Sequence, residues 1–132
     1  MSNESAPLAV VTGSSGGIGR AIASHLLAQG WRVSGLDLAA PTLSHEGFVH
    51  AAVDLSDAGA IARATAALQD ADALVHAAGV LRVGPLGQLD HAGGELMWRL
   101  HVDAATRLAD ALVPAMAARG RGRVVFLSLI HI

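Results

Sequence analysis

Four glycines within seven residues form the part of this sequence whose residue types and spacing most directly suggest chemistry. They follow the apolar run Leu8–Val11, which is typical of a buried strand, and they precede a helical spacing that begins at Ile18. A glycine turn between a strand and a helix presents backbone N–H groups and the helix dipole to a phosphate. Without Cβ atoms, the chain can approach a pyrophosphate closely. The segment Thr12–Gly19 therefore predicts a dinucleotide site, with a tight turn that binds nothing as the alternative.

An acidic residue stands where the second half of such a site requires one. Trp31–Leu36 reads as a second strand, and Asp37 follows it, 18 residues after Gly19. A carboxylate in this place accepts hydrogen bonds from both ribose hydroxyls of the adenosine half and repels a 2′-phosphate. Asp37 is therefore the predicted ribose ligand. The alternative is an acid at a strand end that only meets solvent.

The elements that must position these residues alternate between strands and helices. A first helix from Ile18 to Gln29 places one face toward the sheet, and Gly30 ends it; the residues of that face are Ile18, Ala21, Ile22, His25, Leu26 and Gln29. Further strands are expected over residues 48–53, 73–76 and 123–128. Residues 38–47 read as an irregular connection, too short for the usual helical crossover.

Two further helices complete the pattern. One begins at Ser56 as its N-cap and ends before Asp70. The other begins at Asp90, buries Met97 and Trp98 in its packing, and is kinked or near its end at Pro114. The order β-α-β-β-α-β-α-β predicts a Rossmann-type, doubly wound parallel α/β sheet with strand order 3-2-1-4-5. Its ligand is expected outside the carboxyl ends of the first and fourth strands.

The sequence resembles the short-chain dehydrogenases/reductases in several motifs that occur in the right order. Thr12–Gly19 matches the TGxxxGxG loop of that family, Asp54 lies in VDLSD, and His76–Gly79 is similar to the NNAG turn. Pro85–Leu86, Pro114-x-Met116 and the strand Gly122–Ser128 also match. The resemblance covers residues 8–128 and stops at Leu129, where LIHI replaces the small, polar continuation of the family.

The resemblance implies a cofactor role for twelve residues. The glycine loop would hold the pyrophosphate, Asp37 the ribose, Asp54 the adenine amino group beside the apolar walls Val53 and Leu55, and the turn after the fourth strand would line the cofactor with backbone. The implied residues are Gly13, Ser14, Ser15, Gly17, Ile18, Gly19, Asp37, Asp54, Leu55, Ala77, Ala78 and Gly79. For Ser14 and Ser15, both backbone and hydroxyl donors are expected. Asp54 has an alternative as a plain loop acid beside Ser56.

The resemblance also implies a choice of cofactor. Relatives that prefer NADP often carry Arg or Lys where Gly16 stands, and Leu38 after Asp37 is likewise not basic. NAD is therefore expected over NADP.

Two positions, His76 and His101, depart from the family pattern, and Ser128 keeps one serine of a pair. His76 replaces the leading Asn of the turn, which places the usual structural hydrogen bonds in question. His101 stands where the family has an Asn that holds a water of its proton relay, with a packed helix histidine as the stronger alternative. Ser128 aligns with the first serine of the family's strand-five pair. His101 and Ser128 are the only candidate remnants of a catalytic set. No metal site is expected, because no acid or second histidine stands at ligand spacing to His76, His91 or His131.

Composition excludes several classes of protein. The net charge of −2 provides no field for nucleic acid or an acidic membrane, and no apolar run reaches the length of a membrane span. The absence of cysteine and of a signal peptide favours the cytoplasm. Residues 1–7 read as a disordered tail, 8–128 as an NAD(P)-binding domain, and 129–132 as a tail that does not match the family.

The sequence contains no tyrosine and no lysine, the pair that the family uses for proton transfer in a Tyr-x-x-x-Lys segment. We therefore expect a cofactor-binding portion without strands six and seven, inactive by itself, whose intact parent moves a hydride between NAD(H) and a small-molecule alcohol or ketone. A non-catalytic nucleotide-binding module and an inactive truncated product are the alternatives. The strand 123–128 would lie at an open sheet edge, which favours homo-oligomers or aggregation.

Overall fold

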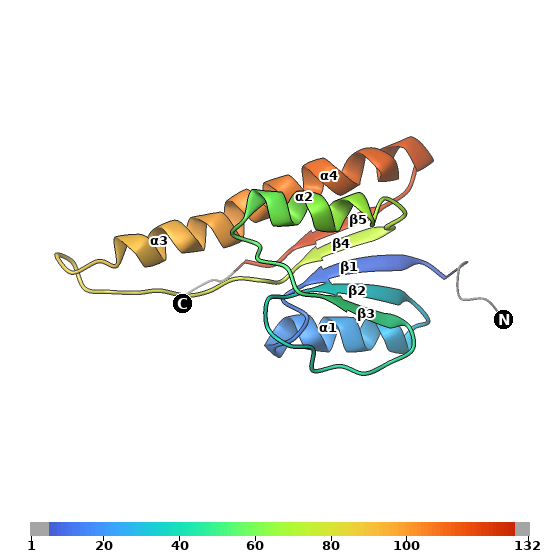
Figure 1. Cartoon of the computed structure of the whole chain (residues 1–132), viewed down its shortest axis with the longest axis horizontal. Helices are drawn as coiled ribbons and strands as arrows, with labels where there is room; N and C mark the ends of the chain where they lie inside the picture. The colour runs from blue at the N-terminus through green and yellow to red at the C-terminus, as the bar shows by residue number, and fades with distance from the viewer. Residues whose placement is uncertain (1–5, 129–132) are drawn as a thin grey trace.

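The fold is a five-stranded parallel sheet with helices on both faces (Figure 1). The structure, a computed structural model, describes residues 6–128. The strand order β3-β2-β1-β4-β5 confirms the prediction. Along the chain the elements are β1 (Leu8–Thr12), α1 (Gly17–Ala28), β2 (Arg32–Leu36), β3 (Phe48–Ala51), α2 (Ala58–Ala66), β4 (Ala73–His76), α3 (His91–Trp98), the π-helical turn η2 (Arg99–Asp103), α4 (Ala104–Arg119) and β5 (Arg123–Phe126).

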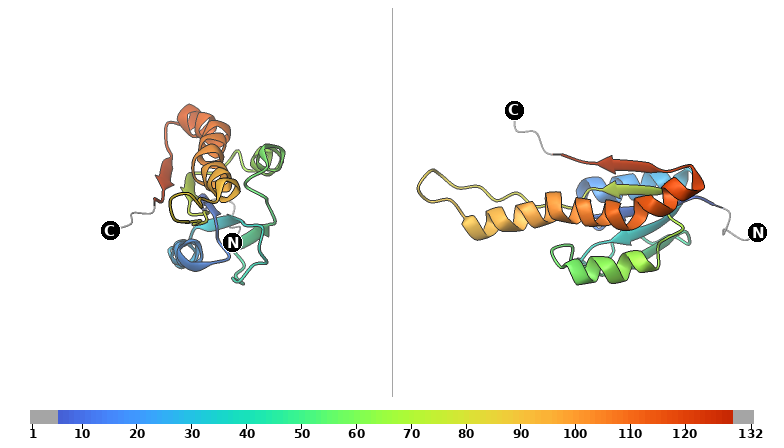
Figure 2. Two further views of the ribbon diagram at one scale, coloured as in Figure 1. Left: turned by 90° about the vertical axis from the view of Figure 1, so that its left-hand side faces the viewer. Right: turned by 90° about the horizontal axis from the view of Figure 1, so that it is seen from above.

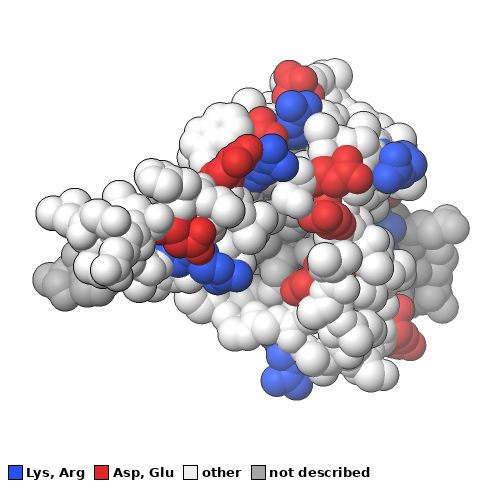
Figure 3. Space-filling view, turned by 60° about the vertical axis from the view of Figure 1, so that its left-hand side comes forward, with Lys and Arg blue, Asp and Glu red and all other residues white. Residues whose placement is uncertain are grey.

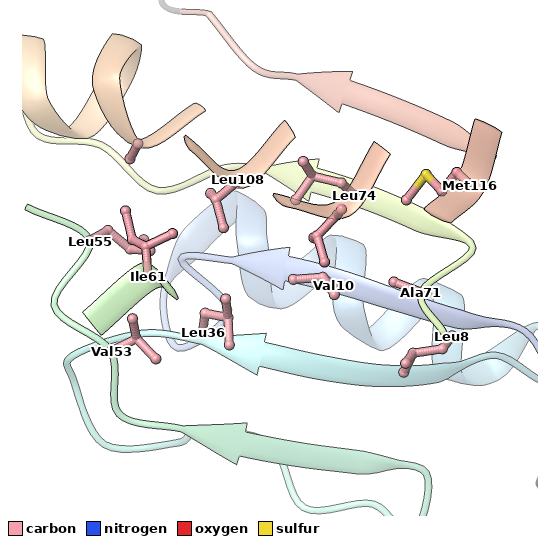
Figure 4. Close-up of a cluster of buried hydrophobic side chains, with 12 residues drawn as sticks. Leu8, Val10, Leu36, Val53, Leu55, Ile61, Ala71, Leu74, Leu108 and Met116 are labelled. Carbon is pink, nitrogen blue, oxygen red and sulfur yellow. The ribbon is translucent and has the colours of Figure 1, made fainter. Parts of the chain in front are cut away.

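Two apolar cores lie on opposite faces of the sheet, because successive side chains of a strand point to opposite sides. In β1, Leu8 and Val10 face the core under α2 and α4, whereas Ala9 and Val11 face α1. Figure 4 shows the first of these cores, in which side chains from the sheet and from α2 and α4 meet; it is made of Leu8, Val10, Leu36, Val53, Leu55, Ile61, Ala71, Leu74, Ala104, Leu108, Leu112 and Met116. The central strand β1 is therefore buried on both faces.

The face that α1 buries overlaps the predicted one only in part: Ile22 and Leu26 are half-buried and pack against the core as predicted. The buried residues of α1 are Gly19, Ala23 and Leu27, whereas Ile18 is 61% exposed and His25 is exposed. The contact at Gly19 explains this difference, because a Cβ there would overlap the carbonyl oxygen of Gly13. The closest approach of helix and turn thus occurs at a residue without a side chain, and periodicity of apolar side chains cannot detect it. Gly30, with φ +89°, follows the helix end as predicted.

Several element boundaries also differ from the prediction. β3 and β5 end at Ala51 and Phe126, earlier than expected. The cap of α2 is Asp57 and not Ser56: the Asp57 carboxylate accepts from the Gly59 N–H at 2.9 Å. Ser56 donates its hydroxyl to Asp54 instead. Asp90 caps α3 as predicted, accepting from the Gly93 N–H.

The predicted long helix is interrupted by the π-helical turn η2. Pro114 lies inside α4, and the helix continues through it to Arg119. Trp98 is 55% exposed, so its predicted burial is wrong. α3 and the loop before it extend beyond the ends of the strands, and Figure 1 shows them as a projecting arm. π-helical turns occur frequently at functional sites, and this one contains Leu100 and His101, which contact the end of β4 and the turn after it.

Candidate functional site

A cleft of about 550 Å³ lies at the carboxyl ends of β1, β2 and β4. Figure 3, a view in which that side of the molecule comes forward, shows a hollow with acidic side chains at its border. This is the place where a doubly wound sheet binds its ligand, since the strand order reverses there. The lining residues come from six segments and are Gly13, Gly16, Leu36, Asp37, Leu38, Val53, Asp54, Leu55, Ser56, Ala77, Ala78, Gly79, Val80, Leu96 and Leu100.

The glycine loop reaches the cleft through a close backbone contact. Gly13 has a φ of +70°, and a Cβ there would lie 2.9 Å from the Cα and N of Ala78. The Gly13 N–H donates to the Leu36 carbonyl at 2.9 Å. The loop is therefore held between the ends of β2 and β4, and α1 begins directly behind it. The first-turn N–H groups of a helix have no partners within the helix, so they can bind an anion.

Ser14 differs from its prediction. Its side chain is 1% exposed, and its hydroxyl has no hydrogen-bond partner among residues 6–128. The hydroxyl points toward Gly35, where a Cβ would overlap it. The predicted use of the Ser14 hydroxyl as a phosphate donor is wrong in this structure, because the hydroxyl is buried against Gly35 of β2. The role of its backbone N–H stays a prediction.

Removing this hydroxyl should stabilise the protein. A buried polar group without a partner costs about 1–3 kcal/mol, so Ser14→Ala is expected to raise the free energy of unfolding by about 1 kcal/mol. Urea denaturation measures this change. The exposed loop variant Ser44→Ala is the control, with an expected change of less than about 0.5 kcal/mol. A Ser14→Ala variant less stable than the parent would contradict the burial described above.

Asp37 joins the glycine loop to the segment after β2. Its Oδ2 accepts from the Ser15 N–H at 3.0 Å, and its Oδ1 accepts from the Ala39 N–H at 2.9 Å. Ser15 also donates its hydroxyl to the Ala39 carbonyl, and Thr42 donates to the Ser15 carbonyl. A carboxylate has about four acceptor positions, so each oxygen retains one for a further donor. Asp37 can therefore orient the loop and accept from two hydroxyls in the cleft.

Asp54 follows β3, lines the same cleft and is exposed. Its Oδ1 accepts from both the hydroxyl and the N–H of Ser56, at 2.6 and 2.9 Å. These hydrogen bonds, the one from the Ser56 hydroxyl first, hold the pKa of the Asp54 carboxyl below its usual value. Oδ2 accepts nothing from the described part of the chain, so an ionised acceptor faces the cleft between the apolar side chains of Val53 and Leu55.

A buried hydroxyl holds the turn after β4. Thr12 Oγ1 accepts from the N–H groups of Ala77 and Ala78, at 3.0 and 3.1 Å. It also lies 2.8 Å from Nδ1 of His76, whose Nε2 lies 2.7 Å from the Leu100 carbonyl. His76 therefore links β1, β4 and η2. Although it replaces the asparagine of the family's turn, its ring makes structural hydrogen bonds at this position.

His101 and Ser128 lie at one smaller cavity of about 170 Å³, next to the larger cleft. Both cavities share the residues Ala77–Gly79. His101 Nε2 lies 2.9 Å from the Val80 carbonyl, and a Cβ on Gly79 would overlap the His101 ring. His101 is thus packed against this turn and is in contact with its backbone. Its use in a proton relay stays a prediction.

Sequence reasoning missed three residues of the site. Thr12 organises the turn, a role that its place in the glycine motif does not indicate, and Leu96 and Leu100 line the cleft. The two leucines come from α3 and η2, which are distant in sequence from the glycine loop. Their helical spacing indicates only that they face the same way; the sheet topology brings them to the cleft.

The comparisons with known proteins agree with this geometry. The family model described as short chain dehydrogenase matches residues 7–130. A short chain dehydrogenase of Pseudocercospora fijiensis is 32% identical over 138 residues, covering 92% of this chain and 44% of the relative. A short-chain dehydrogenase structure from Streptomyces avermitilis has a TM-score of 0.88 and 33% identity, covering 97% and 50% of the two chains.

A metagenomic short-chain oxidoreductase in complex with NADP has a TM-score of 0.83 and 31% identity, covering 98% of this chain and 65% of that one. The fold and site thus define a Rossmann-type dinucleotide-binding protein. The chain belongs to the short-chain dehydrogenase family. It spans about half the length of the curated relatives that it matches, 44% and 56% of the first two. Among residues 6–128, no helix is both long and apolar enough for a bilayer, and no three potential metal ligands cluster.

Proposed function

We propose that residues 8–128 bind NAD in the cleft at the carboxyl ends of the strands, as the cofactor-binding part of an alcohol or ketone oxidoreductase. One observation carries this proposal: Asp37, the glycine loop and Ala77–Gly79 converge on one cleft. In the bound state the loop N–H groups would hold the diphosphate, Asp37 the ribose and Asp54 the adenine amino group. The cofactor would supply a hydride acceptor or donor.

NAD is proposed over NADP on the charge at the ribose end. The cleft wall at Asp37 carries a carboxylate, and the neighbouring lining residues Gly16 and Leu38 bring no cation. A 2′-phosphate there would meet a negative charge without compensation, which costs several kcal/mol at short range. The relative with 31% identity that was solved with NADP makes the opposite preference the competing hypothesis.

Calorimetric titration of the 132-residue chain with NAD⁺ and with NADP⁺ tests this proposal. We expect NAD⁺ to bind and NADP⁺ to bind at least about tenfold more weakly, which corresponds to about 1.4 kcal/mol. Equal affinities would support dinucleotide binding but would exclude the proposed role of Asp37 in selecting NAD. If neither dinucleotide binds, the proposal is wrong.

A non-catalytic nucleotide-binding module is the second candidate. The observation that favours it is the absence of any tyrosine or lysine from the sequence, because the family's proton transfer uses both. NADH oxidation with a panel of small ketones separates the two. Turnover by the 132-residue chain would require another proton donor, for which His101 and Ser128 are the proposed positions. NAD⁺ binding without turnover is the expected result. A cytoplasmic location is proposed on the sequence alone.

Self-association is proposed through β5. In the described part of the chain, β5 pairs with β4 on one side and with no strand on the other, and Figure 2 shows it at the edge of the sheet. Val124, Val125 and Phe126 are 41–53% exposed. Such an apolar edge is a template for pairing with another chain.

A charge on this edge should reduce association. In sedimentation velocity at matched concentrations, the parent chain is expected to form dimers or larger species. Val125→Lys is expected to shift this distribution toward monomer, because a lysine on an edge strand opposes edge-to-edge pairing. Thr106→Lys, on the exposed side of α4, is the matched control. A monomeric parent chain would refute association through β5.

A further inference from the structure

One buried histidine connects three elements that border the cleft. His76 is 2% exposed and ends β4. Its Nδ1 contacts the hydroxyl of Thr12 in β1, and its Nε2 contacts the Leu100 carbonyl in η2. The ring also packs edge to face with the ring of Phe126 in β5, with the two centroids 6.4 Å apart. Both ring nitrogens of His76 thus have a hydrogen-bond partner.

The hydrogen-bond chemistry determines which nitrogen carries the proton. The Leu100 carbonyl can only accept, so Nε2 must donate. Thr12 Oγ1 already accepts from the N–H groups of Ala77 and Ala78, which uses both of its lone pairs. Its one proton must therefore go to His76, and Nδ1 must accept. The arrangement fits the neutral imidazole that is protonated at Nε2.

A second proton on the ring would break this arrangement. Nδ1–H would then need a lone pair on Thr12 Oγ1, and the Thr12 proton would lose its acceptor. At least one of the two N–H groups of Ala77 and Ala78 would have to leave the hydroxyl. These two residues line both cavities, and Gly13 of the phosphate loop packs directly on Ala78. Protonation would therefore displace the turn against which a cofactor is expected to lie.

We propose that His76 is a positioning residue that makes cofactor binding depend on pH, because only the neutral ring holds the turn Ala77–Gly79 in the cleft. This inference rests on the proposed function. It assigns to the site a regulation by protons that operates through Thr12 and not through contact with the cofactor.

The surroundings of the ring support a neutral state near pH 7. Burial is the main cause that lowers the pKa of His76; the hydrogen bond to the Leu100 carbonyl opposes it, and the nearby His101 lowers the pKa further. His101 in η2 is the titratable group that acts on the ring. The charged residues of η2, Arg99 and Asp103, form ion pairs with Glu95 and Arg107 one turn away. The other ring contacts are made by Thr12 of β1 and Phe126 of β5, and neither of these side chains carries a charge.

Folding should show the same dependence on pH. The folded-state pKa is lowered, so the contribution of His76 to stability is fully present above the unfolded value of about 6.5. It is lost as the pH falls from there toward the folded-state pKa. The urea midpoint of the parent chain should decrease over this range. The midpoint of His76→Asn, which keeps a donor and an acceptor but does not titrate, should decrease less.

The experiment measures NAD⁺ affinity of the full 132-residue chain from about pH 8 to about pH 5, together with NMR titration of the His76 ring and of the Ala77 and Ala78 amides. Below the pKa of His76, we expect the Kd for NAD⁺ to rise about tenfold per pH unit, since the ligand then binds only the neutral form. The amides of Ala77 and Ala78 should shift with the same midpoint as the ring. In His76→Asn, this rise in Kd should be absent.

His25→Asn, which removes an exposed histidine of α1, is the matched control and should keep the parent pH profile. His101→Asn tests the other ring at the site. Whatever the affinity of this variant for NAD⁺, its Kd should still rise at pH values below the His76 midpoint. A His76→Asn variant with the parent profile would overturn the proposal, as would amides that do not follow the ring titration. If His76→Asn does not fold, the amides decide. If NAD⁺ binds at no pH, the proposed function fails, and the ring and amide titrations still test the role of His76.

Discussion

Replacing Gly19 by alanine is expected to lower the free energy of unfolding by about 3 kcal/mol and to weaken NAD⁺ binding at least tenfold. The new Cβ would overlap the carbonyl oxygen of Gly13, and that atom belongs to backbone which cannot rotate away. Helix α1 would have to move outward, and the phosphate loop would move with it. Urea denaturation and calorimetric titration with NAD⁺ measure the two effects.

Gly16→Ala provides the matched control within the same loop. Gly16 has a φ of −138°, which any residue adopts, and a Cβ there meets no atom within 4 Å. Its free energy of unfolding should therefore stay within about 0.5 kcal/mol of the parent value. Equal destabilisation by the two variants would show that the loop does not depend on the close contact at Gly19.

Replacing Asp37 by asparagine is expected to reverse the cofactor preference. The carboxylate accepts from the N–H groups of Ser15 and Ala39, and it is proposed to accept from the ribose hydroxyls. Charge-assisted hydrogen bonds contribute about 1.5–3 kcal/mol each, so the Kd for NAD⁺ should rise by about tenfold or more. The Kd for NADP⁺ should fall by about tenfold, because the repulsion of its 2′-phosphate is removed.

Asp110→Asn, an exposed acid on α4 away from the cleft, controls for the change in net charge. It should leave the ratio of the two affinities unchanged, since exposed charges beyond about 10 Å are screened. If Asp37→Asn weakens NAD⁺ and NADP⁺ equally, Asp37 only orders the loop and does not read the ribose. The opposite directions of the two expected changes make this outcome easy to recognise.

The topology of the fold could be predicted from the sequence because most of the strands are short apolar runs followed by a turn or cap signal. Leu8–Val11 and Ala73–His76 are buried in the structure, and the glycine loop follows the first of them as expected. The strand order then follows from right-handed crossovers, which apply to nearly all parallel sheets. These features depend on the local sequence and on the general right-handedness of crossover connections, so they need no knowledge of tertiary contacts.

The details of packing could not be predicted in the same way. The buried face of α1 is set at Gly19, where the helix approaches Gly13, and a glycine adds nothing to an apolar pattern. The Ser14 hydroxyl has the right chemistry for a phosphate but is turned under Gly35 by the path of the loop. Trp98 is apolar but lies on the projecting arm, where the described residues do not cover it.

The role of His76 shows the same limit from another side. In the sequence it is a departure from a motif whose consequence is open. Its function as a link depends on Thr12, which lies 64 residues earlier, and on a carbonyl in η2. The contact between Thr12 and His76 forms only when β1 and β4 are paired, with Thr12 opposite His76 in the register.

A crystal structure of the 132-residue chain with NAD⁺ tests the central claim most directly. The claim predicts the diphosphate against the backbone N–H groups of Gly13–Gly19, the adenosine ribose on the Asp37 carboxylate, and the adenine beside Asp54. Density for the dinucleotide at another surface, or a cleft without density at saturating NAD⁺, would contradict it.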